Sequence, residues 1–110
     1  MSERVAIVVG AGGELGRATA EALAGTGYTV IGIDRNEQGL KELSDGIRRA
    51  VGDATDPAAA KSLIDRIAAE VGPPEVLVNT IGMFRLGEAA ATTPEDLKVL
   101  IDVNLGQPCG

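Results

Sequence analysis

The sequence contains no histidine, no tryptophan and a single cysteine among its 110 residues. Without histidine, imidazole is excluded both as a general base and as a metal ligand, and no metal site is expected. The lone Cys109 excludes a disulfide within the chain and fits a reducing compartment, so we expect a cytoplasmic protein. Aromatic residues make up only 2% of the chain, so valine, isoleucine, leucine and alanine must build its core.

Positive charge and long apolar runs are also scarce. The net charge of −6 argues against nucleic acid or an anionic membrane as a partner, because both select clustered lysine and arginine. No apolar run approaches the length of a membrane span, and residues 1–4 lead into a strand without a signal peptide. The chain length of 110 residues predicts one domain, which is short for a complete dinucleotide enzyme.

Short apolar runs alternate with helical patterns along the chain. Such runs predict buried strands over residues 5–9 and 28–33. A weaker pattern predicts a third strand over 47–51, and a short apolar run predicts a fourth over 76–78. Apolar residues at helical spacing and capping signals predict helices over residues 14–24, 37–43, 57–71 and 94–105, with a loop over 80–92. The alternation predicts an α/β fold, a doubly wound parallel sheet that ends after its fourth βα unit.

Glycines cluster where the first strand meets the first helix. There the chain must turn sharply and bring bare backbone against a phosphate, which a Cβ atom would block. The N–H groups at the start of the helix would face a pyrophosphate, although a merely tight turn is the alternative interpretation. A carboxylate at Glu14 would weaken binding unless it points to solvent. The predicted cofactor-binding residues of this loop are Gly10, Gly13, Glu14, Leu15 and Gly16.

An aspartate, Asp34, ends the second strand. Its carboxylate can accept both ribose hydroxyls of an adenosine and would repel a 2′-phosphate, so it favours NAD over NADP. The neighbouring Arg35 could instead hold a 2′-phosphate, which keeps NADP as the alternative cofactor. A cap for the following helix is the other role that the pattern allows for Asp34.

Three further polar or small residues follow the third and fourth strands, at the edge where ligands of parallel sheets collect. Turn chemistry would also explain Asp53, and Asn79 could serve only to satisfy backbone groups. Gly82 would allow a ligand to approach closely. In the last predicted helix Asn104 falls on the apolar stripe, and the pattern alone favours a core amide with hydrogen-bond partners.

Taken together, these segments resemble the short-chain dehydrogenase/reductase family over essentially the whole chain. The similar segments are the glycine motif at 9–17, Asp34, the run 52–56, the run 79–82 and the run 102–105. The resemblance implies a Rossmann-type dinucleotide-binding domain over residues 1–110, apparently incomplete, with strand order 3-2-1-4. It implies that adenine contacts Asp53 and Ala54, that Asn79 braces the sheet, that Gly82 lines the nicotinamide side, and that Asn104 bends its helix and holds a proton-relaying water.

The chain also departs from the family. Val9 and Glu14 replace the usual Thr and middle Gly of the glycine motif, and the spacing of Gly10, Gly13 and Gly16 matches the family's extended branch. The family's catalytic Ser and Tyr-x-x-x-Lys cannot be assigned, because the only tyrosine is Tyr28 and its i+4 neighbour is glycine.

We interpret the chain as the cofactor-binding half of an NAD-dependent oxidoreductase that acts on a small-molecule alcohol or carbonyl. The alternatives are a non-catalytic nucleotide-binding module, a truncated and inactive gene product, and an enzyme whose partner chain supplies the Tyr and Lys. The fourth strand would be a bare edge beside the partly uncovered helix over 94–105. Because that helix lies at a subunit interface in the related proteins, we expect a homo-oligomer.

The first prediction concerns activity. Because no Tyr–Lys pair exists to move the proton, homogeneous protein of this length should not reduce NAD with any panel of alcohols. Spectrophotometric assay of NADH formation is the measurement, with a complete short-chain dehydrogenase as positive control. Measurable turnover by the isolated chain would contradict it.

Overall fold

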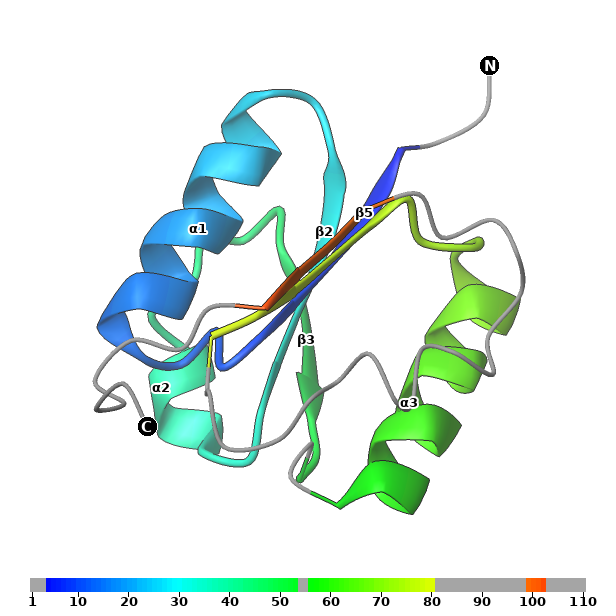
Figure 1. Cartoon of the computed structure of the whole chain (residues 1–110). Helices are drawn as coiled ribbons and strands as arrows, with labels where there is room; N and C mark the ends of the chain where they lie inside the picture. The colour runs from blue at the N-terminus through cyan, green and yellow to red at the C-terminus, as the bar shows by residue number, and fades with distance from the viewer. Residues whose placement is uncertain (1–3, 54–55, 81–98, 103–110) are drawn as a thin grey trace, which may run out of the picture.

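The computed structural model describes residues 4–53, 56–80 and 99–102, with only the backbone for Pro57 and for 99–102. Three helices and five strands occupy these ranges (Figure 1). The predicted loop over 80–92, apart from residue 80, and the candidate residues Ala54, Gly82 and Asn104 lie outside them. In chain order the elements are β1 (Val5–Val9), α1 (Glu14–Gly25), β2 (Thr29–Asp34), α2 (Glu37–Leu40), β3 (Arg48–Val51), α3 (Pro57–Glu70), β4 (Val76–Asn79) and β5 (Val99–Asp102).

All strand pairs are parallel, and the sheet order is β3-β2-β1-β4-β5. Helices α1 and α2 cover one face of the sheet and α3 covers the other (Figure 1). The predicted doubly wound sheet with order 3-2-1-4 is therefore confirmed for the first four strands. β5 extends it by one strand beyond β4.

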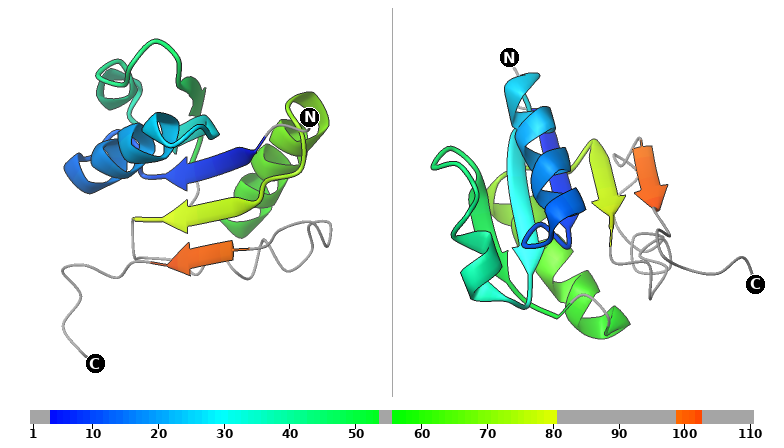
Figure 2. Two further views of the ribbon diagram at one scale, coloured as in Figure 1. Left: turned by 90° about the horizontal axis from the view of Figure 1, so that it is seen from above. Right: turned by 90° about the vertical axis from the view of Figure 1, so that its left-hand side faces the viewer.

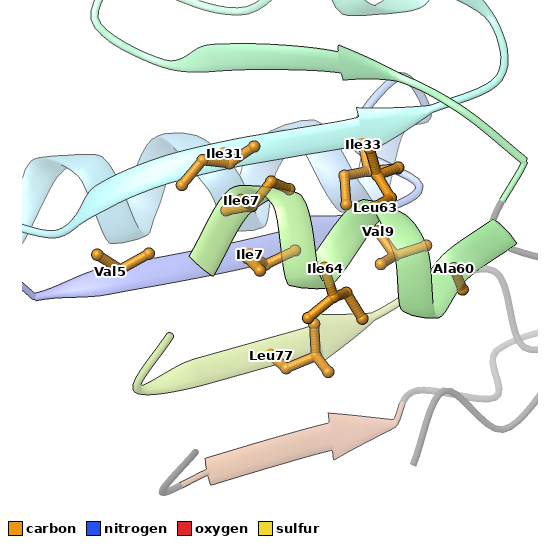
Figure 3. Packing of buried hydrophobic residues seen from close by; sticks show 10 residues of the cluster. All are labelled: Val5, Ile7, Val9, Ile31, Ile33, Ala60, Leu63, Ile64, Ile67 and Leu77. Atoms are coloured by element: carbon orange, nitrogen blue, oxygen red, sulfur yellow. The ribbon is translucent and has the colours of Figure 1, made fainter. Parts of the chain in front are cut away.

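The central strands are buried on both faces because helices lie above and below them. The odd-numbered residues of β1 pack with α3, and Figure 3 shows Ile7 between Ile67 and Ile64 of that helix. The even-numbered residues Ala6 and Val8 pack on the other side, in a cluster that includes Ala20 of α1. This alternation explains why β1 is apolar throughout rather than apolar at every second residue.

The helices begin where the sequence signals predict. Asp56 caps α3, since its side chain accepts a hydrogen bond from the Ala58 N–H. Leu63, Ile64 and Ile67 of α3 are buried in the core, as their spacing predicts. Helix α2 is shorter than predicted and ends at Leu40. Within the described ranges, no helix is both long and apolar enough to cross a membrane.

The predicted helix over 94–105 is wrong where the structure describes it. Val99–Asp102 forms strand β5, which lies beside β4 in Figure 2. Because this pairing satisfies backbone groups of β4, that strand is not the bare edge we expected. Valine and isoleucine favour strands, and a short apolar run does not distinguish strand from helix by periodicity. Self-association through that helix loses its basis, and the oligomeric state stays a prediction.

A side-chain contact ties α1 to the segment between α2 and β3. The Glu21 carboxylate accepts hydrogen bonds from the Ser44 N–H (2.9 Å) and from the Ser44 hydroxyl (2.6 Å). These bonds stabilise the ionised carboxylate and lower the pKa of Glu21 below its ordinary value of 4.5. The contact holds α1 and the connection before β3 together over the same face of the sheet.

The contact makes stability depend on pH. Because the pKa of Glu21 is lowered on folding, its contribution is complete above pH 4.5 and disappears as the pH falls through the folded value. We expect Glu21→Gln to be less stable than the parent at neutral pH, with a difference that shrinks in acid. Urea unfolding at about pH 7 and about pH 3 measures it.

Ser44→Ala serves as the matched variant. It removes the hydroxyl donor but keeps the backbone donor, so it should remove only part of the pH-dependent difference. An equal difference between the parent and Glu21→Gln at both pH values would mean that the Ser44 contact does not form in solution.

Candidate functional site

The candidate residues gather at the carboxyl edge of the sheet. In register, Val9 lies beside Ile33 of β2 and beside Asn79 of β4, so the segments after β1 and β2 emerge together. The backbone N–H of Gly52 donates to the Asp34 carbonyl oxygen (3.1 Å), which brings the segment after β3 to the same edge. Figure 1 shows these connections leaving the sheet at its lower end.

The glycine-rich loop folds tightly over the end of β1. Gly10 has φ = +85°, a left-handed conformation that favours glycine. The N–H groups of Gly10 and Ala11 donate to the Ile33 carbonyl oxygen (2.7 and 3.1 Å), and the Gly13 N–H donates to the Gly10 carbonyl oxygen (3.1 Å). These bonds fix the start of the loop on β2, although a phosphate could still approach its outer side.

The start of α1 is open to an anion. Gly13 is its N-cap residue, and no side chain among the described residues caps this end. Its first-turn N–H groups are therefore those that a helix offers to a phosphate. Glu14 and Leu15 are exposed, so the carboxylate lies at the surface. Gly16 is buried, and it packs so closely on the loop that a Cβ there would collide with the Gly10 carbonyl group.

Asp34 contacts the glycine loop directly. Its Oδ2 accepts a hydrogen bond from the Gly12 N–H (2.9 Å), and its Oδ1 accepts one from the Asn36 N–H (2.9 Å). A carboxylate oxygen can accept more than one hydrogen bond, so both oxygens keep capacity for ribose hydroxyls. The alternative role of Asp34 as a helix cap is wrong, because Asn36 caps α2 by accepting from the Gln38 and Gly39 N–H groups.

The remaining described candidates differ in burial. Arg35 and Asp53 are exposed, whereas Asn79 is completely buried at the end of β4. A hollow of about 360 Å³ lies beside Asp53, between the end of β3 and α3. Next to Asn79, the Thr80 hydroxyl and N–H both donate to the Val9 carbonyl oxygen (2.8 and 3.1 Å), which joins β4 to the start of the glycine loop.

Sequence reasoning missed three residues that shape this site: Gly12, Asn36 and Gly39. Asn36 carries a recognisable signal, since asparagine before a short helix is a common cap. Gly39 carries another, because a glycine inside a helical segment usually has a packing reason. The partner of Gly12 could not be read from the sequence, since Asp34 lies 22 residues away along the chain.

The chain matches the family described as short chain dehydrogenase over residues 4–108. It is 35% identical over 106 residues to the 3-oxoacyl-[acyl-carrier-protein] reductase FabG of Escherichia coli (strain K12), a match that covers 93% of this chain and 43% of FabG. It is 39% identical over 111 residues to the short-chain reductase protein NovJ of Streptomyces niveus, a match that covers 94% of this chain and 42% of NovJ. The chain therefore spans about two fifths of the length of these relatives.

Solved structures show the same fold. The ligand-free aldohexose dehydrogenase of Thermoplasma acidophilum superposes with a TM-score of 0.64 at 34% identity, over 74% of this chain and 30% of that one. A variant of actinorhodin polyketide ketoreductase with NADPH superposes with a TM-score of 0.65 at 29% identity, over 74% of this chain and 35% of the ketoreductase. With a Rossmann-type sheet, a glycine loop held against Asp34 and a family match over residues 4–108, this chain belongs to the short-chain dehydrogenase family.

Proposed function

We propose that residues 1–110 form the dinucleotide-binding domain of an NAD-dependent oxidoreductase that acts on a small-molecule alcohol or carbonyl. The observation that carries this proposal is the hydrogen bond from the Gly12 N–H to the Asp34 carboxylate. It brings the loop suited to a pyrophosphate and the acceptor suited to a ribose into contact. An adenosine diphosphate group would reach from the loop to the carboxylate. A loop that served only as a tight turn would not need this contact with Asp34.

Each part of the cofactor has a proposed partner. The pyrophosphate lies at the open start of α1, against the backbone of residues 10–16, where the helix dipole favours negative charge. The Asp34 carboxylate accepts from the adenosine ribose, and Asp53 with Ala54 contacts the adenine. The proposed nicotinamide side lies near Asn79 and Gly82.

Charge at the ribose favours NAD. The 2′-phosphate of NADP would be repelled by the negative charge of the half-buried Asp34 carboxylate. The carboxylate cannot easily turn away, because hydrogen bonds from the Gly12 and Asn36 N–H groups hold it. Arg35 opposes this preference, but it is exposed, where its attraction to a phosphate is screened by water and salt. The solved ketoreductase with NADPH leaves NADP as the alternative for the family as a whole.

The nicotinamide supplies hydride chemistry at an alcohol or carbonyl carbon when it is bound. Asn104 is proposed to support proton transfer, but this sequence holds no Tyr-x-x-x-Lys pair to perform it. The proposed role of this part of the protein is therefore to bind and orient the cofactor. We also propose a cytoplasmic location. A non-catalytic nucleotide-binding module is the second candidate, because the contact between Gly12 and Asp34 suits a nucleotide whether or not a reaction follows.

Cofactor preference provides one prediction. Calorimetric titration should show weak binding of NAD and weaker binding of NADP. Asp34→Ala should weaken NAD binding by roughly tenfold or more, the cost of losing hydrogen bonds to a charged group, and should abolish the preference. Asp65→Ala removes only a partly exposed ion pair with Lys61, on α3, and should leave both affinities unchanged. Tighter binding of NADP by the parent would mean that Arg35 dominates.

Close packing of the glycine loop leads to a further prediction. In Gly16→Ala the new Cβ would overlap the Gly10 carbonyl group and lie 2.9 Å from the Ala11 Cα, all of it backbone. We expect a loss of about 1–3 kcal/mol in unfolding free energy and loss of measurable NAD binding.

Gly25→Ala is the matched control in the same helix, because nothing lies within 4 Å of its new Cβ. It should fold at least as well as the parent and bind NAD equally. Urea unfolding and NAD titration measure both variants. Equal behaviour of Gly16→Ala and Gly25→Ala would show that the loop is not packed as described.

A further inference from the structure

Gly39 occupies an unfavourable place for a glycine, inside the short helix α2. Its backbone packs directly against the glycine loop. A Cβ at this position would lie 2.7 Å from the carbonyl oxygen of Gly12 and 2.9 Å from the Gly12 Cα. Real Cβ atoms essentially never come this close to backbone, so any side chain at position 39 must displace either α2 or the loop.

Helix α2 is anchored on its other side and cannot easily withdraw. Leu40 is only 1% exposed and packs in the core. The Arg49 guanidinium of β3 donates hydrogen bonds to the carbonyl oxygens of Leu40 (2.8 Å) and Leu43 (2.5 Å). Asn36 caps the start of the helix. Both ends of the helical segment are therefore held in place.

The middle of the glycine loop is held more weakly. On one side the Gly12 N–H donates to the Asp34 carboxylate, and on the other the Gly12 backbone rests against Gly39. Gly12 is thus clamped between the end of β2 and helix α2. A side chain at position 39 would push against Gly12, and the single side-chain hydrogen bond is the contact that would give way.

We propose that Gly39 is a positioning residue that sets the place of the glycine loop and, through it, the affinity for the cofactor pyrophosphate. Gly39 needs no contact with the cofactor for this role, which rests on the function proposed above. The absence of a side chain at position 39 lets Gly12 reach Asp34. The first-turn N–H groups of α1, which follow directly in the chain, then stand where a phosphate can meet them.

The experiment compares Gly39→Ala with Gly46→Ala, using ADP as the probe. Gly46 is exposed and a Cβ added there would have nothing within 4 Å, so its replacement should change neither the loop nor binding. In Gly39→Ala we expect ADP affinity to fall roughly tenfold or more, as for loss of a charge-assisted hydrogen bond. In the ligand-free protein the ¹⁵N–¹H signals of Gly12 and Gly13 should shift, and the Gly12 amide should exchange with solvent faster.

A general loss of stability must be separated from loop positioning. Ile64→Val trims the core beneath α3, on the opposite face of the sheet, and should lower the melting temperature without changing ADP affinity below it. If Gly39→Ala does not fold, Asn36→Ala tests the same idea without a new contact. It removes the cap of α2, and it should speed exchange at Gly12 and weaken ADP binding several-fold.

Two results would overturn the inference. The first is a folded Gly39→Ala, or Asn36→Ala in its place, with Gly12 and Gly13 signals like those of the parent. The second is ADP affinity in these variants that matches Gly46→Ala while the parent binds ADP. If the parent binds neither ADP nor NAD, the proposed function fails instead, and the ligand-free signals still decide whether Gly39 positions the loop.

Discussion

The hydrogen bond between the Gly12 amide and the Asp34 carboxylate joins two segments that lie 22 residues apart along the chain. Neither segment alone defines a dinucleotide site, because a glycine loop can be only a turn and a terminal aspartate only a cap. Their contact places backbone donors beside a carboxylate acceptor at the carboxyl edge of the sheet. The candidate site exists in this form because β1 and β2 are adjacent and parallel, with Val9 in register with Ile33.

Burial of the central strands makes that register specific. β1 is covered by α3 on one face and by α1 on the other, so both sets of alternate side chains are apolar and packed. A shift of one residue would exchange the two sets and disturb both layers at once. The start of the glycine loop is fixed to this rigid sheet, because the Gly10 and Ala11 N–H groups donate hydrogen bonds to the carbonyl oxygen of Ile33, the last buried residue of β2. A loop supported in this way can keep its N–H groups in place before a ligand arrives.

Glycine serves two different purposes around the site. Gly10 is needed for its backbone conformation, since its φ is positive. Gly16 and Gly39 are needed for the absence of a side chain, because each lies against backbone of the loop. The family's glycine spacing points to Gly10 and Gly16, whereas the contact between Gly39 and Gly12 is found only when α2 is seen packed on the loop. The shape of the candidate site therefore depends on close backbone contacts as much as on polar side chains.

The sequence by itself determined the first four strands, the burial of β1 and β2 on both faces and the α/β class, because these follow from local periodicity and backbone demands. The order of those strands and the family followed from the resemblance of the motifs at the strand ends. Only the tertiary structure decided which segments meet. It made Asn36 rather than Asp34 the cap of α2, placed Gly39 against Gly12, and paired Val99–Asp102 with β4 where helical spacing had predicted a helix. Periodicity describes what each segment can form, whereas packing and unpaired backbone groups select among those forms once the neighbours are in place.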